Sequence, residues 1–297
     1  MIRSISTQQQ TTSLRELITS QKRQVDQASM ELATGLKQDV FTGRGSAPSQ
    51  SLEARARMSA NDSYKVANST LATKLDVTSK TLNDVRTTAA DFLGILISGD
   101  LAGTNRETLQ NSAKSALETI VNKLNTSYNG EYLFSGTSTD QAAVVLNSDY
   151  TTTYTGGTGT MSSRIDDTTV LNHGIRADDP AITSIMETLT SIISTDLNSM
   201  DYETFASFRD EASQTIAQSL EDVTRVQARL GDNQSRLEKT ITRQEDMSRI
   251  YTDSILAIEG VLAEEAAVRL EGLSNQIQST FSVTARMSQL SFLNFMP

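Results

Sequence analysis

Apolar side chains recur at steps of three and four residues over most of the chain, which is the spacing of one face of an α-helix. The clearest run covers residues 64–96 and ends at a glycine-containing break over residues 99–103. The same spacing resumes over residues 109–128. We therefore expect two helices that fold back on each other as a hairpin.

Two further helices are predicted behind Pro180. Residues 182–193 carry a shorter helical pattern that begins just after this proline and ends near Asn198. Residues 205–262 then repeat the spacing without a proline, and at 1.5 Å per residue they predict a rod of about 80 to 90 Å. Polar residues interrupt the stripe of this long helix and are expected to fix its register with a partner helix: Gln234, Gln244 and Ser248.

Between these helical regions the pattern is typical of β-structure. The Thr155-Gly156-Gly157-Thr158-Gly159 segment is predicted to be a hairpin turn. The paired acids Asp166-Asp167 are expected to turn one strand into the next, and Asp178-Asp179 to begin the helix at Pro180. The short β-prone runs are residues 144–146, 150–155, 160–165 and 169–175.

Both ends of the chain carry apolar stripes, and the C-terminal stripe is the densest apolar segment of the sequence. In water it would expose several large side chains, so we expect both ends to have packing partners. The predicted interface residues are Leu14, Leu17, Ile18, Val25, Leu32, Leu270, Leu273, Ile277, Phe281, Val283, Met287, Leu290, Phe292, Leu293 and Phe295.

Two interpretations of these stripes remain open. In the first, the two end helices pair with each other inside a monomeric bundle. In the second, the paired ends become fully covered only when neighbouring copies pack around them, so that subunits order as they join. The expected fold is mainly α with a small β insertion, an elongated multi-layer helical coiled-coil or bundle whose core is formed by both chain ends.

Charge and composition narrow the choice of partners. The 297 residues include 26 basic and 36 acidic side chains, a net charge of −10, and no run of Lys or Arg. This argues against binding to nucleic acid. The longest apolar stretch, residues 92–97, is far too short to insert across a membrane. The first residues lack the apolar centre of a cleavable secretory signal, so none is expected.

The residue inventory also argues against an enzyme. The chain has no Cys and one His, which excludes disulfides, cysteine-based metal sites and thiol nucleophiles. We interpret His173 as a solvated loop residue, and we find no Ser with a suitable His partner. Gly156 to Gly159 lacks the Lys-Ser/Thr pair of a phosphate loop. We therefore expect no catalytic residue, no cofactor and no metal.

Five motifs follow one another along the chain: Glu31 to Lys37, Asn129 to Thr137, Arg229-Leu230-Gly231 with Arg236-Leu237-Glu238, Ala263-Glu264-Glu265, and Thr284 to Phe295. In this order they resemble the bacterial flagellin superfamily and within it the proteins of the hook–filament junction. Two segments differ from the family pattern, because residues 38–57 contain Ser46-Ala47-Pro48-Ser49 and residues 258–262 contain Gly260-Val261-Leu262. In the first motif, Gly35 is suited to cap a helix.

The resemblance implies a structural adaptor that joins the hook to the flagellin filament by copolymerisation through its terminal helices. The implied partners are other copies in a ring, the preceding hook-associated protein on the hook side, flagellin on the filament side, and an export chaperone. It also implies export through the flagellar type III apparatus to the extracellular flagellum. The alternatives are a short flagellin that forms the filament itself and a soluble signalling or chaperone coiled-coil protein.

The same resemblance, together with the periodicity, suggests three domains. Residues 1–40 and 260–297 would form the assembly core from the terminal helices. Residues 41–137 and 181–259 would form a central helical rod, and residues 138–180 a small β domain.

Overall fold

The computed structural model describes the backbone of residues 2–41, 46–98 and 106–293. The side chains of residues 2–8, 10, 11 and 287–293 lie outside this description. None of the helices in the described ranges is long and apolar enough to cross a membrane.

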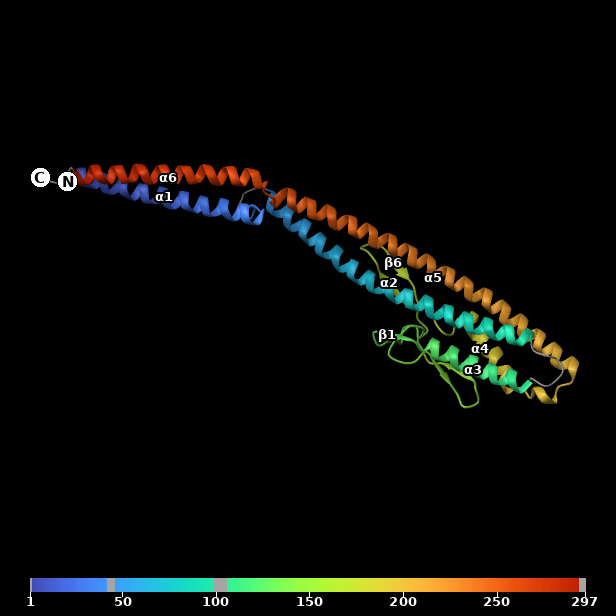
Figure 1. Ribbon diagram of the computed structural model, residues 1–297. Coiled ribbons are helices and arrows are strands. Elements are labelled where there is room, and N and C mark those ends of the chain that lie inside the picture. The colour runs from blue at the N-terminus through green and yellow to red at the C-terminus, as the bar shows by residue number, and fades with distance from the viewer. Residues whose placement is uncertain (1, 42–45, 99–105, 294–297) are drawn as a thin grey trace. The chain divides into compact units, whose positions relative to one another are not determined.

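Helices make up most of the described chain, and the expected mainly α fold with a small β insertion is confirmed (Figure 1). The predicted long helix, α5, contains 58 residues and would measure about 87 Å if it were straight. It ends at Glu259, three residues before the predicted end. The helices are α1 (Ile2–Thr34), α2 (Ala47–Ser98), α3 (Arg106–Leu124), α4 (Pro180–Ser194), α5 (Tyr202–Glu259) and α6 (Ala263–Leu293), with a short 3-10 helix η1 (Leu197–Ser199).

Two predicted helix ends are wrong by several residues. The helix after Pro180 ends at Ser194 and not near Asn198. The helix predicted over residues 109–128 ends at Leu124, because Tyr128 belongs to a hairpin. Its turn residues, Asn129 and Gly130, have φ values of 52° and 82°. Asn-Gly is the preferred pair for such a turn, so a local signal for this hairpin was present in the sequence. The predicted break over residues 99–103 lies outside the described residues.

In the described ranges the strands form three separate antiparallel pairs. The predicted runs of β-structure are confirmed, although each strand is only two or three residues long. Thr155 to Gly159 is not a hairpin turn, because it joins β4 to β5, which do not pair with each other. The pairs are β1 (Ser127–Tyr128) with β2 (Glu131–Tyr132), β3 (Val144–Leu146) with β4 (Thr152–Tyr154), and β5 (Ser162–Arg164) with β6 (Val170–Asn172).

The loop that was predicted to be a turn instead packs against the Asn129 to Thr137 motif. Phe134 is fully buried, and its carbonyl oxygen accepts a hydrogen bond from Ala177 N at 2.9 Å. The next carbonyl oxygen, that of Ser135, accepts from Gly157 N at 2.8 Å. The motif is therefore the point where the segments before and after β3–β4 are tied together.

The paired acids have the expected local roles. Asp179 is the N-cap of α4, and its side chain accepts a hydrogen bond from Ala181 N. Asp166 Oδ1 accepts from the backbone N–H groups of Thr168 and Thr169, which closes the turn between β5 and β6.

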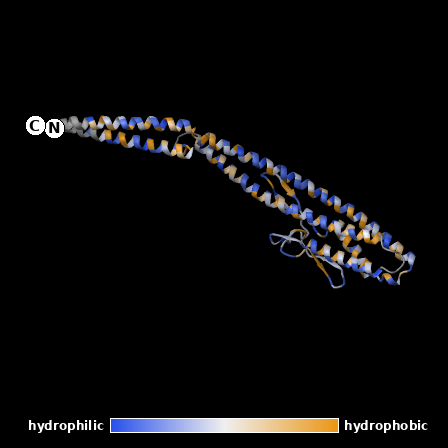
Figure 2. Cartoon of the chain, in the orientation of Figure 1, coloured by the Kyte–Doolittle hydropathy of each residue, from blue (hydrophilic) through white to orange (hydrophobic). Residues whose placement is uncertain are grey.

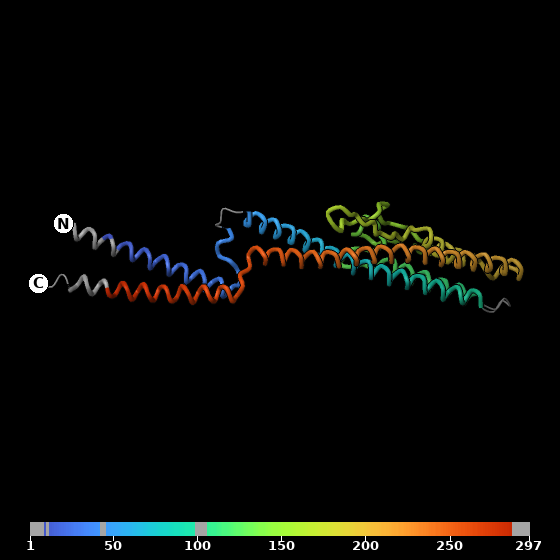
Figure 3. The backbone as a smooth tube through the Cα atoms, turned by 90° about the horizontal axis from the view of Figure 1, so that it is seen from above, coloured from blue at the N-terminus to red at the C-terminus, as the bar shows by residue number. Residues whose placement is uncertain are grey.

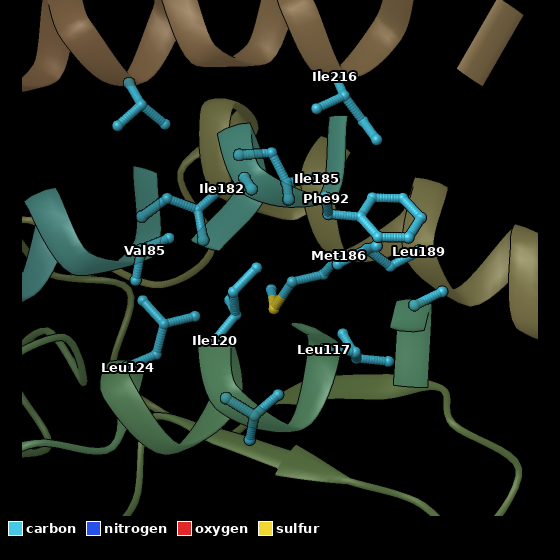
Figure 4. Close-up of a cluster of buried hydrophobic side chains, with 14 of the residues drawn as sticks. Val85, Phe92, Leu117, Ile120, Leu124, Ile182, Ile185, Met186, Leu189 and Ile216 are labelled. Carbon is cyan, nitrogen blue, oxygen red and sulfur yellow. The ribbon is translucent and has the colours of Figure 1, made fainter. Parts of the chain in front are cut away.

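The main hydrophobic core lies where α2, α3, α4 and α5 meet. Figure 4 shows Phe92, Leu117, Ile185 and Ile216, one from each of these helices, pointing toward one another. All four side chains are at most 2% exposed. The helical hairpin predicted from the sequence therefore packs within a four-helix arrangement, and α4 and α5 complete its apolar surface.

A second, smaller core fills the space between α2 and α5 with the β5–β6 hairpin. Ile165 and Leu171 of the hairpin pack among leucines of both helices. Beside them the buried side chains of Asn68 and Gln244 both donate to the carbonyl oxygen of Ile165, at 2.8 and 2.9 Å. Asn68 also donates to Gln244 Oε1. The polar position at Gln244, which the sequence suggested would fix register, thus binds the partner helix and the hairpin together.

The chain divides into two compact units, residues 1–60 with 246–297 and residues 61–245. We call them the terminal unit and the central unit. Both hydrophobic clusters consist of residues 71–241, so they belong to the central unit. The three-domain division proposed from the sequence stays a prediction, because the division into two units rests on backbone contacts alone.

The location of the core predicts a contrast between two Leu→Ala substitutions. Leu117→Ala, in the central unit, should lower the free energy of unfolding by about 2 to 5 kcal/mol, because it leaves a cavity. Leu17→Ala, at a side chain that is 46% exposed, should change it by less than about 0.5 kcal/mol. Urea unfolding followed by circular dichroism measures both. Equal losses would show that the terminal unit carries a core of its own.

Candidate assembly interface

Helices α1 and α6 lie side by side in the terminal unit, so the two chain ends pair as expected (Figure 1). The side chains along their contact, which we call the seam, come from both predicted stripes. On α1 these are Leu14, Ile18 and Val25, and all three are half-buried. On α6 they are Leu270, Leu273 and Ile277, which are half-buried as well. Pairing therefore covers these side chains only in part.

The other predicted interface residues are more exposed or are not described. Leu17 and Leu32 are 46% and 37% exposed, and Phe281 and Val283 are 53% and 51% exposed. Their role in an interface stays a prediction. The side chains of the remaining five lie outside the described residues: Met287, Leu290, Phe292, Leu293 and Phe295.

Small and polar side chains occupy the buried positions of the seam. Ala28 and Ala266 are almost completely buried. Gln21 is 4% exposed, and its Oε1 atom has no hydrogen-bond partner. An unpaired buried acceptor costs about 1 to 3 kcal/mol. Over its described residues the seam therefore brings the two helices together without the dense apolar contact that would stabilise them as an isolated pair.

A group of exposed apolar side chains that was not predicted from the sequence lies near the ends of α1 and α5 and the starts of α2 and α6. They lie off the predicted stripes, and in a sequence such residues cannot be told from the ordinary scatter of surface hydrophobics. In Figure 2, hydrophobic and hydrophilic segments alternate along α1 and α6. The missed residues, each 52–71% exposed, are Met30, Phe41, Leu52, Leu256 and Val268. Leu262, predicted as the last position of the long helical stripe, lies beyond the end of α5 and is 70% exposed.

The same region contains a network of polar contacts, which we call the joint: residues 31–38, 51–55, 259–261 and 269. On the α1 side Glu31, which is 2% exposed, accepts hydrogen bonds from Arg269 Nη1 of α6 at 2.9 Å and from Gln38 N at 3.3 Å. Gly35 then ends α1 with a φ of 69°, and its N–H donates to Glu31 O. The predicted glycine cap is confirmed.

On the α5 side of the joint the buried carboxylate is Glu259, which is 3% exposed. Its Oε1 atom accepts from Arg55 Nε of α2 at 2.9 Å and from the Ser51 hydroxyl, while Oε2 accepts from a second nitrogen of Arg55. Because Arg55 donates hydrogen bonds to both carboxylate oxygens of Glu259, the contact has the bidentate geometry of the strongest arginine–carboxylate pairs.

The electrostatics of the joint favour the ionised acid. Hydrogen bonding to Arg55 is the largest effect on Glu259, and it holds the pKa of this carboxyl below its ordinary value of 4.5. Burial acts in the opposite direction, and the Ser51 hydroxyl adds to the effect of Arg55. Glu259 therefore stays charged at neutral pH although it is buried.

The prediction that His173 is solvated is wrong. Its side chain is 6% exposed, and its Nε2 atom lies 2.9 Å from Ser163 Oγ. Burial, and to a smaller extent the positive charge of Lys74, lowers the pKa of His173. The charged neighbour is thus a cation, whereas a Ser-His nucleophile requires an acid behind the histidine. The pair fills the space between β5 and the segment after β6, and sequence could not reveal it because burial depends on how the hairpin docks.

The lowered pKa of Glu259 predicts how the joint responds to pH. A carboxyl whose pKa is lower in the folded state contributes stability above its unfolded pKa, and this stability is lost as the pH falls through the folded value. The joint should therefore be intact at neutral pH and open only below about pH 4.5. The chain has no Trp, so Leu262→Trp, at a 70% exposed position beside the joint, gives a single fluorescent reporter. With Glu259→Gln in the same chain this acid transition should disappear, and an identical transition in both chains would contradict the assignment.

Comparison with known proteins places these features in a family. Residues 5–139 match the model of the bacterial flagellin N-terminal helical region, and residues 213–296 match that of the bacterial flagellin C-terminal helical region. A search of curated protein sequences finds no match.

Solved structures share the fold at low sequence identity. A Vibrio parahaemolyticus protein described as a flagellar hook-associated protein has a TM-score of 0.60 and 17% identity, over 72% of this chain and 99% of that one. Flagellar hook-associated protein 3 of Legionella pneumophila has a TM-score of 0.60 and 14% identity, over 69% and 98%. The flagellar junction protein of Legionella pneumophila has a TM-score of 0.55 and 12% identity, over 70% and 99%.

At these identities the structural likeness concerns the fold alone, whereas the two family models cover most of the chain and include α1 and α6. The chain therefore belongs to the bacterial flagellin family.

Proposed function

We propose that this chain is a structural adaptor that joins the hook of the bacterial flagellum to its filament by copolymerising through α1 and α6. The observation that carries the proposal is the seam, which leaves its apolar side chains half-buried or exposed while the hydrophobic clusters lie in the central unit. Membership of the flagellin family supports a role in the flagellum. The likeness to proteins described as hook-associated or junction proteins supports the junction in particular.

Packing of neighbouring copies would supply the contacts that the α1–α6 pair lacks. Each large apolar side chain that becomes fully buried can contribute about 1.5 to 3 kcal/mol, and the half-buried residues of the seam would gain part of this. Exposed apolar side chains such as Leu17 and Met30 lie off the seam. Pairing of α1 with α6 leaves these side chains in water, and contact with a neighbouring copy would bury them. Intermolecular burial therefore accounts for the exposure better than a monomeric bundle does.

The proposed division of labour follows the sequence prediction. Residues 1–40 and 260–297 form the assembly core, residues 41–137 and 181–259 a helical rod, and residues 138–180 a small β domain. The proposed partners are further copies in a ring, the preceding hook-associated protein on the hook side, flagellin on the filament side, and an export chaperone. The chain would leave the cell through the flagellar type III apparatus, and no chemical reaction is part of its proposed role.

Two valine substitutions test the proposed interface with a matched control. Val283 on α6 and Val170 on β6 are both 51% exposed, so Val→Ala removes the same apolar surface at each. Val283→Ala should reduce the amount of chain found in detached flagella severalfold at equal secretion, while Val170→Ala should not. Quantitative immunoblots of detached flagella and culture medium measure this. Equal incorporation of both variants would contradict the interface.

Removing residues 282–297 should give a stronger result from the same assay. The central unit keeps all of its core residues, so the truncated chain should remain folded by circular dichroism but fail to enter flagella. Incorporation at the wild-type level would refute the proposed role of the C-terminal stripe. Growth of long filaments from the purified full chain alone would instead favour a short flagellin, and retention in the cytoplasm with protease-resistant ends would favour a soluble coiled-coil protein.

A further inference from the structure

Among the described residues of the terminal unit two carboxylates are buried, and none of these described residues belongs to the two hydrophobic clusters. Glu31 and Glu259 are 2% and 3% exposed, although Glu is among the residues least often buried. Replacing a buried ion pair by apolar residues is often neutral or stabilising, so such a pair is a poor way to gain stability alone. In some proteins a buried polar group selects one arrangement of helices among several.

The position of the two acids suits such a role. Between them, the segment after α1 and the segment between α5 and α6 run antiparallel as a minimal ladder. Lys37 N donates to Glu259 O at 2.7 Å, and Val261 N donates to Gly35 O at 2.9 Å. This ladder has Glu31 on the α1–α6 side and Glu259 on the α2–α5 side.

The backbone at the centre of this ladder has little room for substitution or movement. Leu36 faces Gly260 across the two segments. A Cβ atom at Gly260 would collide with the carbonyl oxygen of Leu256, so this position accepts only glycine without a shift of the backbone. The backbone here is held by hydrogen bonds and by steric fit, while the seam beyond it is loosely packed. The backbone of the joint is thus fixed by specific contacts.

We propose that Glu31 and Glu259 are positioning residues that fix the direction in which α1 and α6 leave the joint before the subunit assembles. Glu31 holds α6 through Arg269, and Glu259 holds the start of α2 through Arg55 and Ser51. The apolar side chains of the seam are then presented to an incoming copy of the same chain in one register, and that copy completes their burial. The claim that the seam is presented to an incoming copy rests on the proposed function. The claim that the two acids order the joint does not.

Distances between spin labels in the free subunit test the order of the joint. The chain has no native Cys, so Ser29→Cys on α1 and Ala267→Cys on α6 place two labels at exposed positions close to it. The distance distribution should be narrow in the wild-type background and clearly broader with Glu259→Gln or Glu31→Gln. The matched control is Glu53→Gln, because Glu53 pairs with Arg57 on the same helix while both side chains are more than 60% exposed. This control should leave the distribution narrow.

Incorporation into detached flagella, measured without the labels, tests the consequence for assembly. At equal secretion, Glu259→Gln and Glu31→Gln should reduce incorporation at least fivefold, and Glu53→Gln should not. If Glu259→Gln lowers the helix content of the free chain, the milder Ser51→Ala, which removes one hydrogen bond to the same carboxylate, takes its place with a smaller effect in the same direction.

The two readouts separate the inference from the proposed function. Distributions that stay narrow in all variants would overturn the inference, as would broad distributions with wild-type incorporation. Broadening together with reduced incorporation would support it. If the wild-type chain is itself absent from flagella, the proposed function fails, and the distance distributions alone decide whether the two acids order the joint.

Discussion

Partial burial of the α1–α6 seam is the constraint that distinguishes the terminal unit from the central unit, which holds both hydrophobic clusters. Two helices that pack only against each other can cover a narrow stripe, and every other apolar side chain on them faces water. Here the stripe itself is incompletely covered, because alanines and Gln21 take its most buried places while its leucines and isoleucines remain half-exposed. The terminal helices therefore keep apolar surface exposed, and in the proposed function neighbouring subunits bury this surface.

In the central unit, long helices of the same kind have their apolar side chains buried by other elements of the same chain. Over part of their length α2 and α5 pack with α3 and α4, and over another part the β5–β6 hairpin packs against both helices. In Figure 3 the yellow-green β segment lies on one side of these helices. Asn68 and Gln244 close that second part by sharing the carbonyl oxygen of Ile165. In the terminal unit polar contacts are found at the joint, but the described part of the chain supplies no third layer over the seam. The joint is ordered, whereas packing along the seam is incomplete. This combination suits a subunit whose terminal helices are oriented before assembly and are stabilised when neighbouring copies pack against them.

Features that depend on neighbouring residues were predictable from the sequence, whereas features that depend on distant pairing were not. The helical periodicity of α2 and α5, the N-cap Asp179 and the C-cap Gly35 are local, and all are confirmed. Which strands pair is decided across loops, so Thr155 to Gly159 was wrongly predicted to be a hairpin turn. The burial of His173 depends on how a hairpin docks. Glu31 and Arg269 are 238 positions apart, and nothing in either local sequence indicates the other.

Hydrogen exchange, measured on the purified subunit and on detached flagella, tests the central claim most directly. The account predicts that the parts of α1 and α6 far from the joint, residues 12–25 and 273–286, exchange rapidly in the free subunit and slowly in the organelle, while the central unit is protected in both. Equal protection of these residues in the two states would contradict it, because the terminal helices would then be fully packed before any neighbour arrived.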